Sequence, residues 1–280
     1  MILWFDGSLH TSSAGLVDAL DHGLTVGDGV FETCEIRQGQ VFALTRHIAR
    51  LVRSATGLGL LPPSDDQVRH AVEAVRQEWL ATQEAGTLGR LRITWTDGPG
   101  PLGSERLQTP GTLIVAAAPT SPPKPVRVRI VPWTRNERSA VAGLKTTSYA
   151  ENARALAYAA EHGDGEAIFG NNREELCEGT GTNIFIEAGG VLYTPPLDSG
   201  CLAGITRELV LEWAGDSGVE VREETMPLAR LQQAEHAALT SSTRGLVPII
   251  AVDGRDLLPG PVTTRFGPEF TKRSVEQVDP

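Results

Sequence analysis

Cysteine is scarce in this sequence, and long apolar runs are absent. The 280 residues include three cysteines, Cys34, Cys177 and Cys201, an odd number without the paired spacing of a metal site. We therefore expect no disulfide framework and no metal site, as suits a reducing cytoplasm. No apolar stretch approaches the ~20 residues of a membrane span, and the first residues do not resemble a secretory signal. The sequence thus predicts a cytoplasmic protein that has no membrane partner.

Positive charge is also in short supply. Lysine and arginine together number 25 against 35 acidic residues, which gives a formal net charge of -10. Proteins that bind nucleic acid or anionic membranes usually present a basic surface to the phosphates. We therefore expect neither kind of partner, although a small basic pocket remains compatible with this charge.

Lysine is the rarest of the charged residues, with Lys124, Lys145 and Lys272 as its only positions. Lys124 lies in a proline-rich stretch and Lys272 in a charged terminal segment. Lys145 follows the apolar residues 142–144 and precedes a helical pattern. Burial near apolar groups lowers the pKa of a lysine and makes its amine nucleophilic. Lys145 is thus the candidate for lysine chemistry, and a structural lysine at a loop-to-helix junction is the alternative.

The hydrophobic patterns predict an α+β protein of two domains. Four prolines within residues 119–125 indicate a stiff linker. A smaller N-terminal α/β domain should span 1–118, and a larger C-terminal mixed α/β domain should span 126–280. The expected strands are 30–36, 41–44, 91–95, 112–118, 126–133, 166–170, 219–223, 237–241 and 246–252, with a hairpin over 183–195. The expected helices are 45–57, 65–79, 149–162, 204–213, 229–236 and 263–278.

Several scattered groups complement the lysine. Glu178 precedes a hydroxyl-rich loop, and a solvated glutamate is the plain interpretation. Ile205 and Thr206 follow Gly204 at a helix start, where free backbone N–H groups favour an anion. Ser241, Ser242 and Thr243 offer hydroxyls at a strand end, and Arg50 on an amphipathic helix could reach a phosphate. Together these groups match the needs of pyridoxal 5′-phosphate (PLP): a lysine, a carboxylate for the pyridine nitrogen and a phosphate cup.

The region from Glu178 to Arg207 resembles a known family. Glu178-x-Thr180-x-x-Asn183-Ile184-Phe185, Leu192-x-Thr194 and Leu202-x-Gly204-Ile205-x-Arg207 are similar to the class IV aminotransferase motif of fold-type IV PLP enzymes. GDGVFET (27–33), HIARL (47–51) and SSTRGLVPI (241–249) extend the resemblance over essentially the whole chain. It implies a fold-type IV subunit with PLP between two domains, usually in a homodimer, that acts on an amino acid or amine and a keto acid.

The resemblance also implies roles for individual residues. Lys145 corresponds to the lysine that forms a Schiff base with PLP, and Glu178 to the partner of the pyridine nitrogen. Leu202 resembles the residue that packs on the ring, and Tyr149 the tyrosine at its phenolic oxygen. The implied phosphate cup consists of Arg50, Ile205, Thr206, Ser241 and Ser242. The implied substrate residues are Phe31, Thr33, Arg92 and Thr243.

The family includes enzymes with different substrates, and a few positions of the sequence indicate which of these activities to expect. Branched-chain enzymes share V-F-E-G-[IL]-R, whereas this chain has Thr33-Cys34-Glu35 after Phe31-Glu32. The R-x-H carboxylate trap of D-amino-acid aminotransferases is also altered, leaving Arg106 or Arg92 for the carboxylate. Our first prediction is a D-amino-acid transaminase that also accepts (R)-amines. The alternatives, in order, are an aminodeoxychorismate lyase making 4-aminobenzoate and pyruvate, a branched-chain aminotransferase, and a PLP-binding protein without turnover.

Overall fold

The computed structural model describes residues 1–107 and 110–280, which form two compact units. The first unit consists of Met1–Pro122, Leu144–Tyr149 and Gln277–Pro280, and the second of Pro123–Gly143 and Ala150–Glu276. The division at Pro122 falls inside the stretch predicted as a linker. Two segments are grouped differently from the prediction, which gave all residues after 125 to the second domain. One of them, Leu144–Tyr149, carries Lys145.

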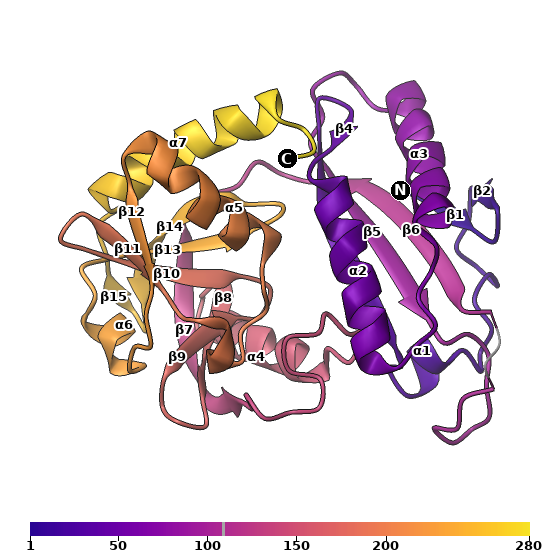
Figure 1. Ribbon diagram of the computed structural model, residues 1–280, viewed down its shortest axis with the longest axis horizontal. Helices are drawn as coiled ribbons and strands as arrows, with labels where there is room; N and C mark the ends of the chain where they lie inside the picture. Colours follow the sequence, from indigo (N-terminus) through magenta and orange to yellow (C-terminus); the bar gives the residue numbers. More distant parts are fainter. Residues whose placement is uncertain (108–109) are drawn as a thin grey trace. The chain divides into compact units, whose positions relative to one another are not determined.

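In the described part of the first unit, six strands form one sheet covered by helices (Figure 1). Its elements are β1 (Ile2–Phe5), β2 (Ser8–His10), α1 (His22–Thr25), β3 (Gly29–Arg37), β4 (Gln40–Val41), α2 (Leu44–Leu58), α3 (Asp65–Thr82), β5 (Gly89–Thr96) and β6 (Thr112–Pro119). The strand order is β2-β1-β6-β5-β3-β4, with every neighbouring pair antiparallel. Only β1–β2 and β3–β4 are joined by short turns, whereas β1–β6 and β3–β5 pair strands that are distant in the sequence.

Helices α2 and α3 cover one face of this sheet and build its core. Alternate residues of β3, Val30, Cys34 and Ile36, are fully buried and share that core with helix residues such as Leu51 and Val72. Because side chains alternate across a strand, the residues between them point to the opposite face. This alternation places Phe31 and Thr33 on the face that α2 and α3 do not cover.

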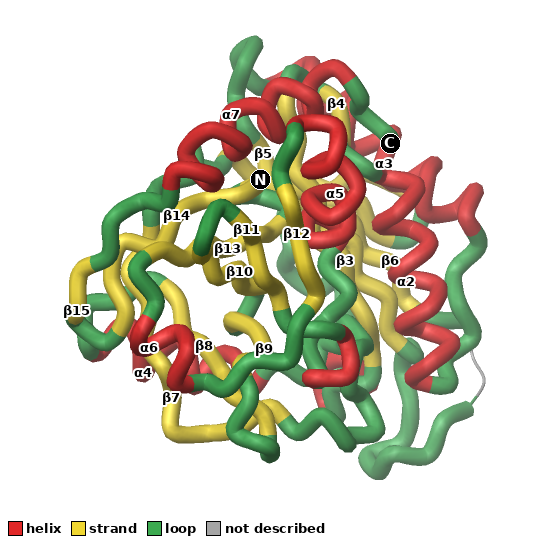
Figure 2. Tube along the Cα trace, turned by 60° about the vertical axis from the view of Figure 1, so that its left-hand side comes forward, coloured by secondary structure: helices red, strands yellow, loops and turns green. Residues whose placement is uncertain are grey.

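In the described part of the second unit, nine strands form a mixed sheet (Figure 2). Its elements are β7 (Val126–Arg135), α4 (Ala150–Glu161), β8 (Glu166–Asn171), β9 (Leu176–Gly179), β10 (Asn183–Ala188), β11 (Val191–Thr194), the 3₁₀ turns η1 (Leu197–Ser199) and η2 (Gly215–Ser217), α5 (Ile205–Ala214), β12 (Glu220–Glu223), α6 (Ala229–Gln233), β13 (His236–Ser241), β14 (Gly245–Val252), β15 (Arg255–Asp256) and α7 (Pro261–Glu276). The order is β12-β11-β10-β13-β14-β7-β8-β9, and β15 pairs with β14.

The hairpin of β10 and β11 follows from its two-glycine turn. Gly189 and Gly190 have φ values of 59° and 81°, which a two-residue turn of type I′ requires at both positions. Ile186 on one face of the hairpin and Leu192 on the other are both buried, so protein covers both faces of the hairpin. The predicted hairpin over 183–195 is confirmed, and it spaces Glu178 from the start of α5.

One predicted strand differs from the structure. The sequence indicated a strand over 41–44, but β4 ends at Val41 and α2 already begins at Leu44. Ala43, between them, has a left-handed φ of 54°, which turns the chain from strand into helix. Apolar residues in a short run do not distinguish a strand from the start of a helix.

Among the described residues, none of the helices has the length and apolar character that a membrane span requires.

Helix α2 is capped by residues far away in the sequence. Its N-cap, Ala43, provides no side-chain hydrogen bond. Instead, the Thr45 backbone N–H donates to the Asp279 carboxylate at 2.9 Å, and the Thr45 hydroxyl donates to the other oxygen at 2.5 Å. The Ala43 N–H donates to the Val278 carbonyl at 2.7 Å. The segment 277–280 thus satisfies N–H groups that a helix start otherwise leaves open.

We expect the substitution Asp279→Ala to lower the free energy of unfolding by about 1 kcal/mol, because it removes the cap of α2. Asp279→Asn keeps an acceptor oxygen and should retain most of the stability. Urea denaturation at equal protein concentrations measures both. Equal losses for the two variants would show that the acceptor oxygen at position 279 does not account for the stability.

Candidate active site

Lys145 lies on a short extended segment that adds to the edge of β3. The Phe31 N–H donates to the Lys145 carbonyl at 3.0 Å, and the Thr147 N–H donates to the Gly29 carbonyl at 2.8 Å. The Lys145 N–H itself donates to the Ser54 hydroxyl of α2 at 3.2 Å. Backbone hydrogen bonds on both sides of the lysine fix where its side chain starts.

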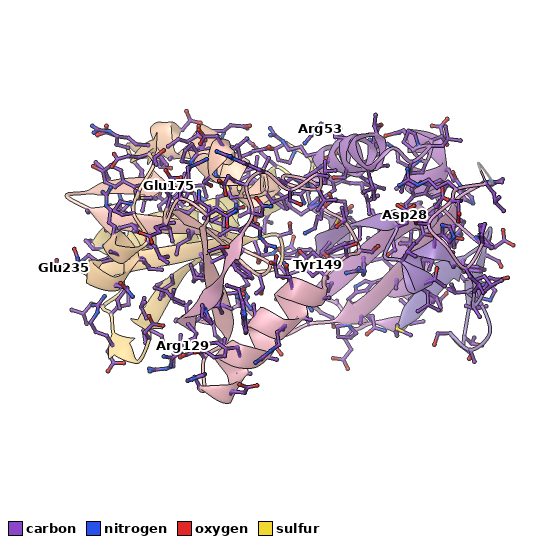
Figure 3. All side chains as sticks on the ribbon, turned by 90° about the horizontal axis from the view of Figure 1, so that it is seen from below. Asp28, Arg53, Arg129, Tyr149, Glu175 and Glu235 are labelled. Carbon is purple, nitrogen blue, oxygen red and sulfur yellow. The ribbon has the colours of Figure 1, made fainter. Side chains whose placement is uncertain are left out.

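The sheet face opposite α2 and α3 gathers five of the six predicted residues of the first unit, and Arg50 is the exception. The Lys145 ammonium nitrogen, Nζ, lies 4.5 Å from the centre of the Phe31 ring, and the Arg92 guanidinium carbon lies 3.7 Å from the same centre. Thr33 is directly opposite Arg92 in the β3–β5 register. Tyr149 meets Phe31 edge to face at 5.0 Å and ends the segment that leads into α4 (Figure 3). These five residues therefore share one surface.

The two arginines considered for a carboxylate differ in their partners. Arg106 binds both oxygens of Asp28, at 2.6 and 2.7 Å, and donates to two backbone carbonyls at the end of α2. Arg92 donates to the Thr94 hydroxyl at 3.2 Å, and no described carboxylate pairs with it. Its side chain is partly exposed, yet desolvation by the surrounding protein lowers the pKa of its guanidinium. Arg92 is thus the better-placed group for an incoming carboxylate.

The opposite face of β3 carries a buried ionic network. The Arg50 Nε and Nη2 groups donate to the two Glu32 oxygens at 2.8 and 2.7 Å, and His47 Nδ1 lies 2.6 Å from the Glu32 carboxylate. Burial would raise the pKa of Glu32, but the contacts with Arg50 and His47 outweigh it and hold the pKa well below its ordinary value. Burial lowers the pKa of His47, while its contact with Glu32 acts in the opposite direction. The network fixes the orientation of Arg50.

In the second unit, Glu178 is tied to the predicted ring-packing residue. Its carboxylate accepts from the Leu202 backbone N–H at 2.8 Å, and its other oxygen lies 3.3 Å from Arg135 Nε. The Asn183 side-chain amide donates to the Leu202 carbonyl at 2.9 Å. The loop at Leu202 is therefore fixed from both sides, by β9 and by β10.

The start of α5 is open to an anion. Gly204 is the N-cap and has no side chain to satisfy the amides of Ile205 and Thr206. A Cβ at Gly204 would lie 1.9 Å from the Asn183 amide oxygen, so this close approach requires glycine. Thr240 pairs with Asn183 in the β10–β13 register, and its buried hydroxyl has no hydrogen-bond partner among the described residues. Open helix amides and a buried, unsatisfied hydroxyl fit the phosphate of PLP.

The predicted hydroxyl residues lie in the turn between β13 and β14. Ser241 ends β13, and Ser242 and Thr243 form the turn, which the Arg244 N–H closes on the Ser241 carbonyl at 3.1 Å. All four are half-buried. The Arg244 guanidinium lies 3.3 Å from Glu166, which anchors the turn to β8. The turn thus has a defined position in the sheet that also carries Glu178.

Sequence reasoning assigned no role to four residues that support this arrangement: Glu32, His47, Arg135 and Asn183. Glu32 could have been found, because it is an acid at a core-facing position of an alternating strand. His47 stands three residues before Arg50, on the same helix face. Asn183 could have been found, because it is a position of the quoted motif, as is its partner Leu202. Arg135 gave no such indication, since its partner Glu178 is distant in the sequence.

Together, the two-unit fold and these residues define a fold-type IV PLP enzyme. The family model for amino-transferase class IV matches residues 29–252, so the chain belongs to the class IV aminotransferase family. Its cofactor is PLP, and the family's substrates are amino acids and keto acids.

Three similar proteins span nearly the full length of the chain. A putative branched-chain-amino-acid aminotransferase of Methanocaldococcus jannaschii is 32% identical over 91% of this chain and 89% of that protein. A bifunctional aminodeoxychorismate lyase / D-amino acid transaminase of Mycobacterium tuberculosis is 28% identical over 95% and 96%. The structure of a branched-chain aminotransferase from Thermoproteus uzoniensis has a TM-score of 0.90 and 31% identity over 99% and 95%.

The substitution Glu32→Gln should lower the free energy of unfolding at pH 7 by about 3–5 kcal/mol, because it leaves the Arg50 charge buried without its partner. Because the pKa of Glu32 is lower in the folded chain, its contribution is complete above the ordinary value of 4.5 and declines as the pH falls below it. The substitution should therefore cost less stability at pH 3.5 than at pH 7, which urea denaturation measures.

The matched control is Glu73→Gln. The hydrogen bond from Arg76 lowers the pKa of Glu73 to about 2, but this pair lies on the surface of α3, where water screens it. Glu73→Gln should cost less than about 1 kcal/mol. A loss as large as that of Glu32→Gln would contradict the importance of burial.

Proposed function

We propose that the protein is a PLP-dependent transaminase of the D-amino-acid type, which moves the amino group of a D-amino acid to a 2-keto acid and also accepts (R)-amines. The supporting observation is Arg92, a partly desolvated guanidinium without a carboxylate partner among the described residues. It stacks on the Phe31 ring that Lys145 Nζ also contacts. An arginine binds a carboxylate through two parallel hydrogen bonds, so it can orient an amino acid beside the lysine.

The branch assignment draws on the strand that carries Phe31. Thr33 and Cys34 stand where branched-chain enzymes have Gly-[Ile/Leu], and Thr33 faces Arg92 across the sheet. The relative from M. tuberculosis, whose name includes D-amino acid transaminase, is consistent with this choice. Because fold alone does not determine substrate, we base the proposal on these pocket positions.

The residues divide the reaction between them. When bound, PLP supplies the electron sink for the bond that breaks at the substrate Cα. The Lys145 amine would move the proton away from the substrate Cα. Glu178, which accepts a hydrogen bond from the Leu202 N–H, would hold the pyridine nitrogen, and Leu202 would pack against the ring.

Other residues bind and orient the cofactor and the substrate. Arg50 and the Ile205 and Thr206 amides hold the phosphate, with Ser241 and Ser242. The Tyr149 hydroxyl binds the phenolic oxygen of the cofactor. The substrate is positioned by Arg92, with Phe31, Thr33 and Thr243 around it. Since Glu32 holds two nitrogens of Arg50, the phosphate meets a guanidinium whose orientation is already set.

Aminodeoxychorismate lyase is the second candidate. It would use the same lysine and cofactor to release 4-aminobenzoate and pyruvate. Phe31-x-Thr33 and Arg92 are compatible with it, and one relative carries both activities in its name. Branched-chain activity is the third candidate, favoured by the names of the proteins from M. jannaschii and T. uzoniensis.

The family resemblance also leads us to propose that the protein forms a homodimer. Light scattering, which measures the mass of the particle in solution, tests this proposal.

Three reactions separate the candidates: D-alanine with 2-ketoglutarate, L-leucine with 2-ketoglutarate, and aminodeoxychorismate alone. The proposal expects pyruvate and glutamate from the first, at a kcat/KM at least tenfold above that of the second. Formation of 4-aminobenzoate in the third reaction without transamination would assign the lyase, and a preference for L-leucine would assign the branched-chain branch. Bound PLP without turnover in any of the three would favour a binding protein.

Lys145→Ala should abolish the visible absorbance of lysine-bound cofactor and reduce turnover by roughly 10³-fold or more, because the base is lost. Lys124→Ala is the control, since Lys124 is exposed in the proline-rich segment and should leave both unchanged. Absorbance spectra and initial rates measure the two variants. Full turnover of Lys145→Ala would remove the lysine from the mechanism.

Arg92→Gln should lower kcat/KM for the amino acid by roughly 10–100-fold, mainly through KM, because a charge-assisted hydrogen bond is lost. The matched control is Arg90→Gln, two residues earlier on the same exposed face of β5. It should leave the kinetics unchanged. For an (R)-amine without a carboxylate, Arg92→Gln should have little effect; an equal loss there would argue against carboxylate binding.

A further inference from the structure

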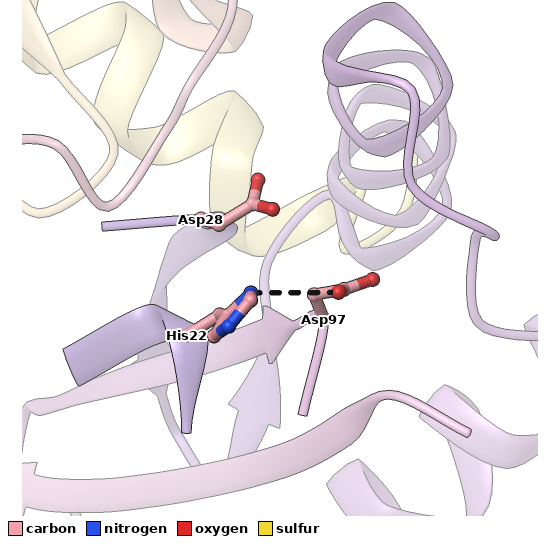
Figure 4. Close-up of side chains that lie close together, drawn as sticks. All are labelled: His22, Asp28 and Asp97. Atoms are coloured by element: carbon pink, nitrogen blue, oxygen red, sulfur yellow. Dashed lines mark ion pairs between the residues drawn. The ribbon is translucent and has the colours of Figure 1, made fainter. Parts of the chain in front are cut away.

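Three side chains converge in the first unit, near the turn that precedes β3. His22 of α1, Asp28 of the turn before β3 and Asp97 after β5 each place one ligand atom within 4.8 Å of the others (Figure 4). The side chains are 0%, 12% and 11% exposed, respectively. Arg106 already pairs with Asp28, and a further positive group between the two acids would offset the cost of their close approach.

The hydrogen bonds of His22 determine which ring nitrogen is available. Its Nε2 lies 2.9 Å from the Pro101 carbonyl, which can only accept, so Nε2 carries the proton. The loop packs tightly here, since a Cβ at Gly100 would come within 2.3 Å of Nε2. In the neutral ring, Nδ1 therefore presents a lone pair.

That lone pair has no hydrogen-bond partner among the described residues, although His22 is fully buried. Nδ1 points toward Asp97, with 3.7 Å to the nearer carboxylate oxygen. This separation is too long for a hydrogen bond. Two ligands bound at ~2.0–2.2 Å to one metal ion lie roughly 3–4 Å apart, so the distance suits a shared ion.

We propose that His22 Nδ1 and the carboxylates of Asp28 and Asp97 bind a divalent transition-metal ion, with Zn²⁺ as the best fit. An imidazole nitrogen beside two carboxylates suits Zn²⁺, whereas Ca²⁺ and Mg²⁺ prefer oxygen ligands alone. The Asp28 oxygens also accept from Arg106, but each keeps a second lone pair. The nearby guanidinium should weaken the affinity to the micromolar range.

The ion would connect three separate segments: α1, the turn at Gly27–Gly29 and the loop after β5. The same turn accepts hydrogen bonds at the Gly27 carbonyl from the hydroxyls of Thr147 and Ser148, at 3.0 and 2.9 Å. These residues follow Lys145 directly. The ion would therefore be a structural clip for the segment that carries the lysine.

The first experiment uses the wild-type PLP-loaded protein. After chelator treatment and dialysis, a Zn²⁺ titration should show one ion per chain with a micromolar Kd. In ¹⁵N spectra of histidine-labelled protein, one histidine of the six should shift at Nδ1 while its Nε2–H persists. No binding tighter than about millimolar, or binding without that shift, would overturn the proposal.

Two substitutions locate the ion. Asp97→Asn preserves the shape of the side chain, and His22→Asn removes the ring; each should weaken Zn²⁺ binding at least tenfold. The control is His70→Gln, because His70 is exposed on α3 and should leave the Kd unchanged. Melting curves with and without Zn²⁺ should show a stabilising shift for wild type and control only. Zn²⁺ binding that persists in Asp97→Asn and in a folded His22→Asn would overturn the site.

Discussion

The arrangement of the first unit depends on the pairing between β3 and the segment after Gly143. Two backbone hydrogen bonds, from Phe31 to Lys145 and from Thr147 to Gly29, fix the lysine against a strand whose other edge is bonded to β5. A lysine side chain has many rotamers, but its starting point here is set by a sheet. Phe31 and Arg92 are then positioned by the same strand register, so the three groups keep their spacing.

Because the side chains of β3 alternate between its two faces, this strand carries residues of the proposed substrate site on one face and a buried ionic network on the other. Its odd residues, Phe31 and Thr33, face the surface that carries Lys145, and its even residues face the helices. Among the even residues, Glu32 binds Arg50 and His47 within the core. A group proposed for the substrate and a group that orients a proposed phosphate ligand are thus neighbours in sequence, one residue apart.

Much of this could be predicted from the sequence, because periodicity and motif spacing are local. The α+β class, the hairpin over 183–195 and the family are confirmed. What the sequence could not reveal depends on contacts between distant residues. Arg106 was a candidate for the carboxylate until its pairing with Asp28 emerged. The expectation of no metal site rested on cysteine spacing, which cannot detect His22 and Asp97 meeting across 75 residues, and it stays a prediction. The roles of the individual site residues stay predictions.

The division of the chain into units has a consequence for how the protein is made. The first unit begins at Met1, yet it includes Leu144–Tyr149 and Gln277–Pro280, so neither unit is one continuous stretch. A ribosome releases the residues that cap α2 only after the whole second unit has been synthesised. The first unit therefore cannot reach its final form early during translation, and cutting the chain at Pro122 would separate α2 from its cap and β3 from its lysine.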